Sequence, residues 1–382
     1  MNRRVVVTGI GIVSPNGINK TAFAASLKEG ISGIRPVCRF SQESLAPVAA
    51  EVEGVETDGQ DRAIAFALRA SHEALEESGL LHDSASPDTF GSVFCSSKGD
   101  LASFNQPDRF MYHFPTSSVS TALLQRFPQL QGPSLNLVAA CATGTFALIR
   151  GAQLIREGRC RAVLAGAADA SMTPLLVAAY RQMGVLSEET MRPFDRYRSG
   201  FVVGEGAAAL ILEERDSARR RGAKSYGEIV GEAMVQDSFH PVRFCPQSHS
   251  LAAAIRQTLC GARLSPEKLD YLNAHGTATQ TGDPYETREI KEALGEAAYR
   301  IPVSATKSMT GHLLGASGAV EFAACLLAME GHFIPPTLNL EEPDEACDLD
   351  YVPGEARAAR LRTVLSVSMG FGGHIGAILV KK

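Results

Sequence analysis

The stretch VAACATG, residues 138–144, places a cysteine between an apolar run and an amphipathic run. Free cysteine is most often a small buried residue, so a structural role for Cys141 is the first alternative. Two features favour a nucleophile instead. The small neighbours allow a sharp turn and the close approach of a substrate. A helix predicted to begin at residue 143 would direct its positive end toward the sulfur and lower the thiol pKa toward neutrality.

Three further segments combine histidine, lysine and glycine in ways that suit catalysis. NAHGTATQTGD (273–283) ends a predicted strand on His275, and functional groups gather at the carboxyl ends of strands in α/β proteins. SATKSMTGHLLGASGAVE (304–321) brings a lysine and a histidine into a turn rich in serine and glycine. MGFGG (369–373) is either a plain hairpin or a source of backbone N–H groups for an oxyanion. A core histidine or a solvated lysine remains the alternative for each polar residue.

Buried strands must hold these segments in place. The strand-like runs are continuously apolar rather than alternating, which indicates an α/β fold with sheets covered on both faces. Helix-like runs with apolar residues at helical spacing lie between them. Strands are predicted at 3–13, 89–97, 134–140, 161–170, 204–214, 226–235, 268–276, 301–305 and 363–380, the last as two strands around a glycine turn, and helices at 61–79, 143–158, 250–262, 283–294 and 317–331.

The order of strand, polar glycine turn and apolar helix occurs twice in the chain. It is found first around Cys141 and again in residues 301–327. This repetition indicates two similar halves. We predict an N-terminal half, residues 1–240, that carries the cysteine, and a C-terminal half, residues 241–382, that carries the histidines and the lysine.

The composition narrows the possible function classes. The chain has 382 residues, 45% of them hydrophobic and 21% charged, which is enough for a sizeable core. A net charge of −5 argues against broad nucleic-acid binding. The eight cysteines form no C-x-x-C pair, which argues against a zinc site and suits the reducing cytoplasm. The apolar N-terminal run reads as a first strand, and no membrane span is expected.

The four chemical segments together resemble one family. AACATG, NAHGTATQTGD, SATKSMTGHLLGASGAVE and GFGG occur in the order of the elongating beta-ketoacyl-ACP synthases, the type II Cys-His-His condensing enzymes of the thiolase superfamily. RPFDRYRSGFVVGEGAAALILEE and PPTLNLEEPDEACDLDYVP are also similar to connecting segments of that family. The resemblance covers nearly the whole chain. It implies the thiolase fold, in which two similar α/β halves form a five-layered αβαβα arrangement.

The resemblance implies a decarboxylative Claisen condensation. Cys141 would take an acyl group from acyl-ACP, and malonyl-ACP would then lose carbon dioxide and attack the acyl-enzyme. His275 and His312 would promote decarboxylation and stabilise the enolate, since donors are needed where negative charge develops. Lys307 and Glu321 would support the two histidines. The other implied site residues are the backbone N–H groups of Cys141 and Phe371 in an oxyanion hole, and Thr277, Thr279, Met369, Phe371 and Gly372 in substrate binding.

The same resemblance implies the surroundings in which the protein works. It would act in the cytoplasm on acyl carrier protein (ACP), in fatty-acid or related lipid or polyketide synthesis. The expected assembly is a homodimer, with a related second ketosynthase subunit as the alternative partner. No nucleic acid, membrane, metal or cofactor beyond the phosphopantetheine arm of ACP is expected. Because ACP is acidic, docking needs local positive surface. The candidate docking residues are Arg62, Arg69, Arg192, Arg196 and Arg198.

Three departures from the family pattern bear on substrate choice. VSMGFGGHI stands where NSFGFGGTN is usual, so that Met369 replaces a gating phenylalanine and His374 a threonine. The stretch 96–137 is shorter than in typical members. Ser199 stands where an aspartate is common.

Two other functions remain open at the level of the sequence. A cysteine hydrolase that uses Cys141 and one histidine would release free acid without any malonyl substrate. A non-catalytic partner subunit, similar to a chain-length factor, would shape a pocket or bind ACP. The departure of VSMGFGGHI (367–375) from the family pattern favours the partner subunit, whereas the presence of Cys141 argues against it.

Overall fold

Two sets of five strands form the framework of the molecule. The structure is a computed structural model that describes residues 3–39, 46–57, 59–81, 89–99, 101 and 116–382. The first set consists, in spatial order, of β1 (Val5–Val13), β7 (Glu205–Glu214), β6 (Ala162–Ala170), β4 (Phe90–Cys95) and β5 (Ser134–Leu135). The second set consists of β8 (Gly227–Gln236), β14 (His374–Lys381), β13 (Thr363–Gly370), β9 (Tyr271–Asn273) and β10 (Val303–Ser304).

The two sets have the same topology. Successive neighbours in each set pair antiparallel, antiparallel, parallel and parallel. A short antiparallel contact of β1 with β8 joins the sets into one ten-stranded sheet. The predicted two similar halves are therefore confirmed. The sequence placed the division between residues 240 and 241, but β8 hydrogen-bonds within the second set, and we propose that the halves divide before Gly227.

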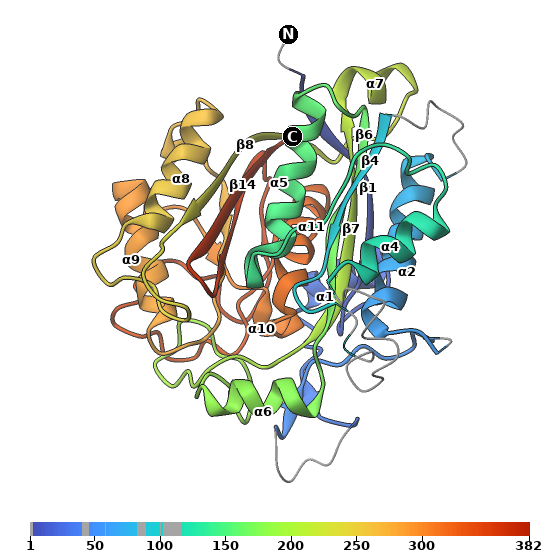
Figure 1. Ribbon diagram of the computed structural model, residues 1–382. Helices are drawn as coiled ribbons and strands as arrows, with labels where there is room; N and C mark the ends of the chain where they lie inside the picture. The colour runs from blue at the N-terminus through green and yellow to red at the C-terminus, as the bar shows by residue number, and fades with distance from the viewer. Residues whose placement is uncertain (1–2, 40–45, 58, 82–88, 100, 102–115) are drawn as a thin grey trace.

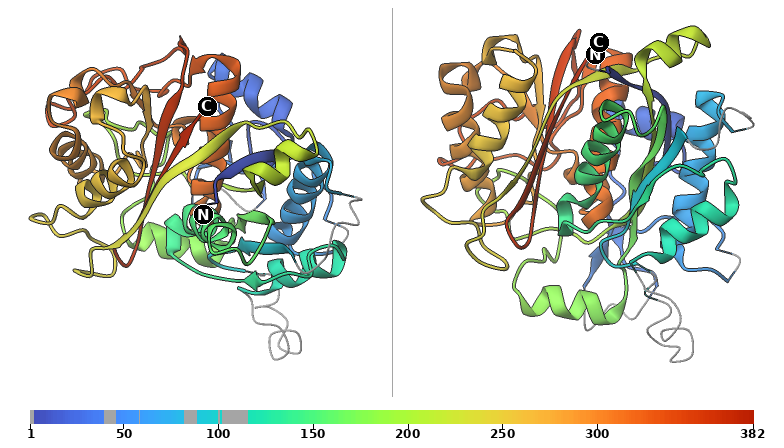
Figure 2. Two further views of the ribbon diagram at one scale, coloured as in Figure 1. Left: turned by 90° about the horizontal axis from the view of Figure 1, so that it is seen from above. Right: turned by 45° about the horizontal axis from the view of Figure 1, so that its top comes forward.

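Helices separate and cover the two sets in five layers, as predicted (Figure 1). The central layer contains α5 (Thr143–Arg156) and α11 (Ser317–Gly331), which contact each other and strands of both sets. The tilted view on the right of Figure 2 shows the same order of layers. The outer layers are α2 (Arg62–Ser78) with α4 (Ser118–Arg126) on the first set, and α8 (Ser250–Gly261) with α9 (Gly282–Leu294) on the second.

The central helix α11 is apolar on all sides because both of its faces are covered. Every residue from Ser317 to Met329 is buried. The stretch Leu314–Gly331 is long and apolar enough to cross a membrane by length and composition, but 89% of it is buried inside the fold. We therefore interpret it as a core helix, in keeping with the rule that a helix without a polar face must be enclosed.

Most predicted elements are confirmed, and the exceptions lie where the chain turns toward the site. The run 134–140 was predicted as one strand, but only two of its residues pair, and 268–276 and 301–305 also pair over shorter lengths than predicted. The sequence analysis missed several short elements. These are α1 (Lys20–Glu29), α6 (Pro174–Gln182), α7 (Arg215–Arg220), α10 (Lys307–Thr310), the pair β2 (Arg35–Pro36) and β3 (Val48–Ala49), the pair β11 (Phe333–Ile334) and β12 (Arg357–Ala358), and α4.

Glycine allows α5 and α11 to meet with their backbones nearly in contact. A Cβ atom at Gly144 would lie 2.6 Å from the backbone nitrogen of Ala319, and one at Gly318 would collide with Thr145. A backbone atom cannot move aside as the end of a flexible side chain can. The two glycines therefore set how closely the first turns of these helices approach.

We expect Gly144→Ala to destabilise the fold by about 1–3 kcal/mol, since the added methyl group overpacks a rigid helix contact. Gly261→Ala is the matched control, because a Cβ at that helical position would meet no atom within 4 Å. The control should be neutral or stabilising by up to about 1 kcal/mol, as alanine is the better helix former. Denaturant unfolding of both variants measures the difference, and equal free energies of unfolding would contradict the close-contact interpretation.

Candidate active site

Cys141 lies in a single 3-10 turn, η3 (Ala140–Ala142), immediately before α5. Ala140 has a φ of 48°, a left-handed conformation that residues with a side chain rarely adopt. The Thr143 hydroxyl supports the turn by accepting from the Ala139 N–H at 2.9 Å and donating to the Ala140 carbonyl at 2.7 Å. Behind it, a Cβ at Gly370 would lie 2.6 Å from the Ala139 carbonyl oxygen. Only a glycine at that position lets the turn form.

His312 lies beside the sulfur. Its Nε2 atom is 3.2 Å from Cys141 Sγ, and its Nδ1 atom is 2.9 Å from the hydroxyl of Ser317. The ring of Phe201 packs edge-on against the imidazole, with centroids 5.0 Å apart. The sequence analysis predicted His312 but missed Ser317 and Phe201. The signal for Ser317 was its place five residues after the histidine, at the start of a helix.

His275 faces His312 across the site. The two imidazole centroids are 5.6 Å apart, and the rings are nearly perpendicular. The backbone N–H groups of His275 and Gly276 both donate to the buried carboxylate of Glu286, at 2.6 and 2.8 Å. Glu286 belongs to α9, so this helix fixes the segment that follows β9 and contains His275. The sequence analysis did not predict a role for Glu286.

Lys307 joins His275 to Glu321 in a fully buried cluster. Its Nζ atom donates to the His275 carbonyl at 2.6 Å, lies 3.2 Å from His275 Nδ1, and forms an ion pair with the Glu321 carboxylate. An ammonium group has donors but no acceptor. His275 Nδ1 must therefore accept, which leaves the proton of the neutral ring on Nε2.

Burial controls the protonation of Cys141, His275 and His312. Burial, followed by the charge of Lys307, holds the pKa of both His275 and His312 well below the ordinary value, so both rings are neutral at physiological pH. Burial raises the pKa of Cys141 to about 11, although Lys98 and Lys307 oppose the shift. The predicted lowering of this pKa was wrong, because desolvation of the sulfur outweighs the nearby positive charges. Cys141 is therefore a neutral thiol at physiological pH.

Asp169 holds together two segments that flank the site. At the end of β6, its carboxylate accepts from the Ser96 hydroxyl at 2.6 Å, the Ser97 N–H at 2.9 Å and the Gly315 N–H at 2.7 Å. Gly315 follows His312 by three residues, so these bonds fix the turn that carries the histidine. The sequence analysis missed Asp169, although one acidic residue inside an apolar strand was an available signal.

A cavity of about 790 Å³ leads from the protein surface to Cys141 and the two histidines. The predicted substrate-binding residues Thr277, Thr279, Met369 and Phe371 all line it. The N–H of Phe371 is directed at the Cys141 sulfur, as an oxyanion-hole donor beside this residue requires. Gly372 is not among the lining residues. Its N–H donates to the Pro241 carbonyl at 2.6 Å instead.

Two of the five arginines predicted to dock ACP are structural. Arg198 is 3% exposed, pairs with Asp344 and donates to the carbonyls of Thr279 and Gln280, so it anchors the loop that carries the cavity threonines. Arg62 pairs with the buried Glu205. The docking prediction was wrong for Arg198, because its guanidinium is enclosed by the fold. Arg62, Arg69, Arg192 and Arg196 remain predictions.

Of the residues that depart from the family pattern, Met369 lies at the cavity, whereas His374 and Ser199 are not among its lining residues. Met369 lines the cavity, whereas His374 packs against the edge of Phe146 with ring centroids 6.0 Å apart. Ser199 donates to the Ser187 hydroxyl at 3.0 Å. Residues 100 and 102–115 of the shortened stretch 96–137 lie outside the described residues. Within the described part of the chain, no group of three His, Cys, Asp or Glu side chains has the arrangement of a metal site.

Comparisons with known proteins agree over the whole chain. Residues 2–218 match the family described as "Beta-ketoacyl synthase, N-terminal domain", and residues 226–341 match "Beta-ketoacyl synthase, C-terminal domain". The 3-oxoacyl-[acyl-carrier-protein] synthase 2 of Coxiella burnetii is 36% identical over 408 residues, covering 100% of this chain and 99% of the relative. The tetracenomycin polyketide synthase ketoacyl synthase alpha subunit of Streptomyces glaucescens is 37% identical over 416 residues, covering 100% and 97%. The solved structure of the ishigamide ketosynthase/chain length factor has a TM-score of 0.93 at 31% identity, with full coverage of both chains.

The raised pKa of Cys141 predicts how its alkylation depends on pH. Below about pH 11 the thiolate fraction should rise about tenfold per pH unit, and so should the rate of reaction with iodoacetamide. Mass spectrometry of the peptide containing Cys141, with free glutathione as the reference thiol, measures this rate. A plateau near neutral pH would show that the helix end outweighs burial.

Breaking the buried ion pair should destabilise the protein strongly. Lys307→Met leaves the Glu321 carboxylate buried without its cation, which costs about 3–5 kcal/mol. Burial raises the pKa of Glu321 to about 7, so the loss should be larger above that pH, where the carboxylate is charged, than below it.

The double variant Lys307→Met/Glu321→Leu is the control for this experiment. It removes both charges and should recover most of the lost free energy of unfolding. Denaturant unfolding at pH values on either side of about 7 measures the native protein, Lys307→Met, Glu321→Leu and the double variant. Additive losses in the double variant would contradict a coupled pair.

Proposed function

The chain belongs to the beta-ketoacyl synthase family, whose members are acyl-transferring condensing enzymes, and we propose that it is an active 3-oxoacyl-ACP synthase. The observation that carries the proposal is the contact of His312 Nε2 with Cys141 Sγ at 3.2 Å, at the bottom of a cavity that His275 also lines. The substrates would be an acyl group on ACP and malonyl-ACP. The product would serve fatty-acid or related lipid or polyketide synthesis.

In the first half-reaction, Cys141 takes the acyl group. The sulfur attacks the thioester carbonyl of acyl-ACP while its proton passes to the neutral His312 Nε2. The N–H groups of Cys141 and Phe371 stabilise the oxyanion of the tetrahedral intermediate. The carbon–sulfur bond to the carrier then breaks, and the leaving thiolate takes the proton from His312.

In the second half-reaction, the same histidines act as donors. The Nε2–H groups of His275 and His312 hydrogen-bond to the thioester oxygen of malonyl-ACP. The bond to its carboxylate breaks, carbon dioxide leaves, and the electron pair forms an enolate. The enolate carbon attacks the acyl carbonyl on Cys141, and the carbon–sulfur bond breaks. The beta-ketoacyl-ACP leaves, and the Cys141 thiolate takes up one proton from solvent water.

His312 therefore needs two tautomers. It accepts at Nε2 in the first half-reaction and donates from Nε2 in the second. The Ser317 hydroxyl at Nδ1 suits both, because a hydroxyl accepts from Nδ1–H in one tautomer and donates to Nδ1 in the other. Lys307 and Glu321 position His275 without lining the cavity. The proposed chemistry uses only groups of this chain and the phosphopantetheine arm of its substrate.

We also propose the assembly and location that the family resemblance implied. Among the described strands, β5 has a neighbour on one side only, and Val138 beside it is 48% exposed, so this edge suits pairing with a second copy or a related ketosynthase subunit. All eight cysteines are free, which suits the reducing cytoplasm.

Intact-protein mass after incubation with acyl-ACP of several chain lengths tests the proposed function. We expect a mass increase of one acyl group, absent in Cys141→Ala, that malonyl-ACP discharges as beta-ketoacyl-ACP. His312→Ala should lower acylation by about 100-fold or more, since it removes the base.

The outcomes separate the alternatives. Release of free acid without malonyl-ACP would indicate a cysteine hydrolase. Absence of any adduct at every chain length would indicate a non-catalytic partner subunit. Either result would contradict an active condensing enzyme.

A further inference from the structure

The open end of the cavity is positively charged. The described residues that line it include two arginines, Arg243 and Arg288, and no aspartate or glutamate. Both arginines are exposed, whereas Cys141 and the two histidines at the other end are buried. A cleft lined by one sign of charge concentrates ligands of the opposite sign. The entrance therefore favours an anionic group.

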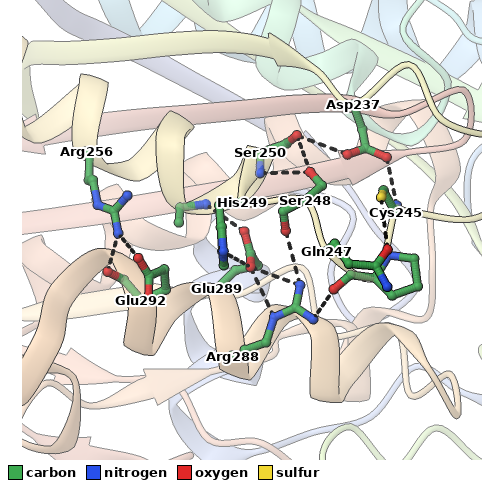
Figure 3. A network of polar contacts seen from close by, with 12 residues as sticks. Asp237, Cys245, Gln247, Ser248, His249, Ser250, Arg256, Arg288, Glu289 and Glu292 are labelled. Atoms are coloured by element: carbon green, nitrogen blue, oxygen red, sulfur yellow. Dashed lines mark hydrogen bonds and ion pairs between the residues drawn. The ribbon is translucent and has the colours of Figure 1, made fainter.

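Arg288 already uses its charge within the protein. Its guanidinium donates to the carbonyls of Pro246 and Ser248, at 2.5 and 3.1 Å, and pairs with the Glu289 carboxylate at 3.0 Å (Figure 3). Glu289 is fully buried and also lies 3.1 Å from His249 Nδ1. Arg288 is thus a structural connection between α9 and the loop that precedes α8.

The same loop carries Arg243 and is fixed at several points. The Asp237 carboxylate accepts from the Cys245 N–H at 2.9 Å and from the Ser250 hydroxyl at 3.0 Å (Figure 3). The Pro241 carbonyl accepts from the Gly372 N–H at 2.6 Å. These bonds lie on both sides of Arg243, so its backbone is anchored while its side chain extends to the entrance.

Arg288 pairs with Glu289, whereas Arg243 can use its positive charge to bind a ligand. Within the described part of the chain, its guanidinium forms no hydrogen bond or ion pair, although the loop around it is rich in polar contacts. Beside it, Phe244 stacks on Tyr285 with ring centroids 5.2 Å apart and forms an apolar wall of the cavity. An unpaired guanidinium next to an apolar channel suits a ligand with one anionic end and an extended, mostly uncharged body.

We propose that Arg243 binds the phosphodiester of the phosphopantetheine arm at the cavity entrance. This inference rests on the proposed function, in which the thioester end of the arm reaches Cys141. The phosphate lies at the opposite end of the arm and remains near the surface. A guanidinium binds phosphate oxygens in a bidentate manner, which fixes orientation as well as affinity.

Three substrates with the same acyl group separate the sources of negative charge. Acyl-pantetheine has no phosphate, acyl-phosphopantetheine has the phosphate alone, and acyl-ACP adds the carboxylates of the carrier protein. For Arg243→Ala, we expect kcat/KM for acylation of Cys141 to fall roughly tenfold to 100-fold with the two phosphate-containing substrates. The value for acyl-pantetheine should not change. Arg243→Lys should retain part of the effect, because it keeps a charge but loses the bidentate geometry.

Arg159→Ala is the matched control. This exposed arginine follows the C-terminal end of α5, whereas Cys141 precedes its N-terminal end. We expect no change with any of the three substrates. A loss for Arg243→Ala with acyl-ACP alone would assign Arg243 to the protein surface of the carrier and overturn the proposal. Equal losses with all three substrates, or none, would also overturn it.

A binding measurement keeps this test separate from the test of the proposed function. Calorimetric titration with free phosphopantetheine and free pantetheine requires no acyl transfer. We expect the phosphate to strengthen binding to the native protein by at least tenfold and to give no such gain in Arg243→Ala. Equal affinity of the native protein for both compounds would overturn the proposal, even if acyl transfer occurs. Absence of acylation with a retained phosphate effect would contradict only the proposed function.

Discussion

The ammonium group of Lys307, enclosed completely by protein, is the interaction on which the site depends. A buried charge is tolerated only when it has an opposite charge and good acceptors. Glu321 supplies the charge from α11, and the segment just after β9 supplies the His275 carbonyl and Nδ1. The lysine therefore fixes the distance between a strand end and the central helix. That distance determines where the two histidines lie relative to the sulfur.

The duplicated architecture explains how two halves provide one site. In the first half, the turn between β5 and α5 carries Cys141. In the second, the segment between β10 and α11, which includes the short helix α10, carries Lys307 and His312. The two central helices meet near their first turns, where Gly144 approaches Ala319 closely. Equivalent turns are thus brought together by equivalent helices, and each has acquired different chemistry.

Local sequence patterns predicted the parts of the site that depend on local structure. The cysteine turn, the histidine at the end of a strand and the glycine hairpin each have a short signature. The supporting groups do not, because Asp169 and Gly315, or Glu286 and His275, come together only after the sheets have formed. The pKa of Cys141 likewise depends on contacts that a local sequence pattern does not reveal. The helix after it is visible in the sequence, but the burial that dominates comes from the rest of the chain.

The enclosed position of α11 has a consequence for synthesis of the chain. This apolar helix is complete at Gly331, but β13, which covers part of it, begins only at Thr363. During translation, one face of α11 is therefore without its native cover until the residues of β13 have also left the ribosome. The nascent chain must pass through an interval in which its most apolar helix is open to chaperones and to aggregation. The lining of the cavity and the cover of this helix are both completed by the hairpin of β13 and β14.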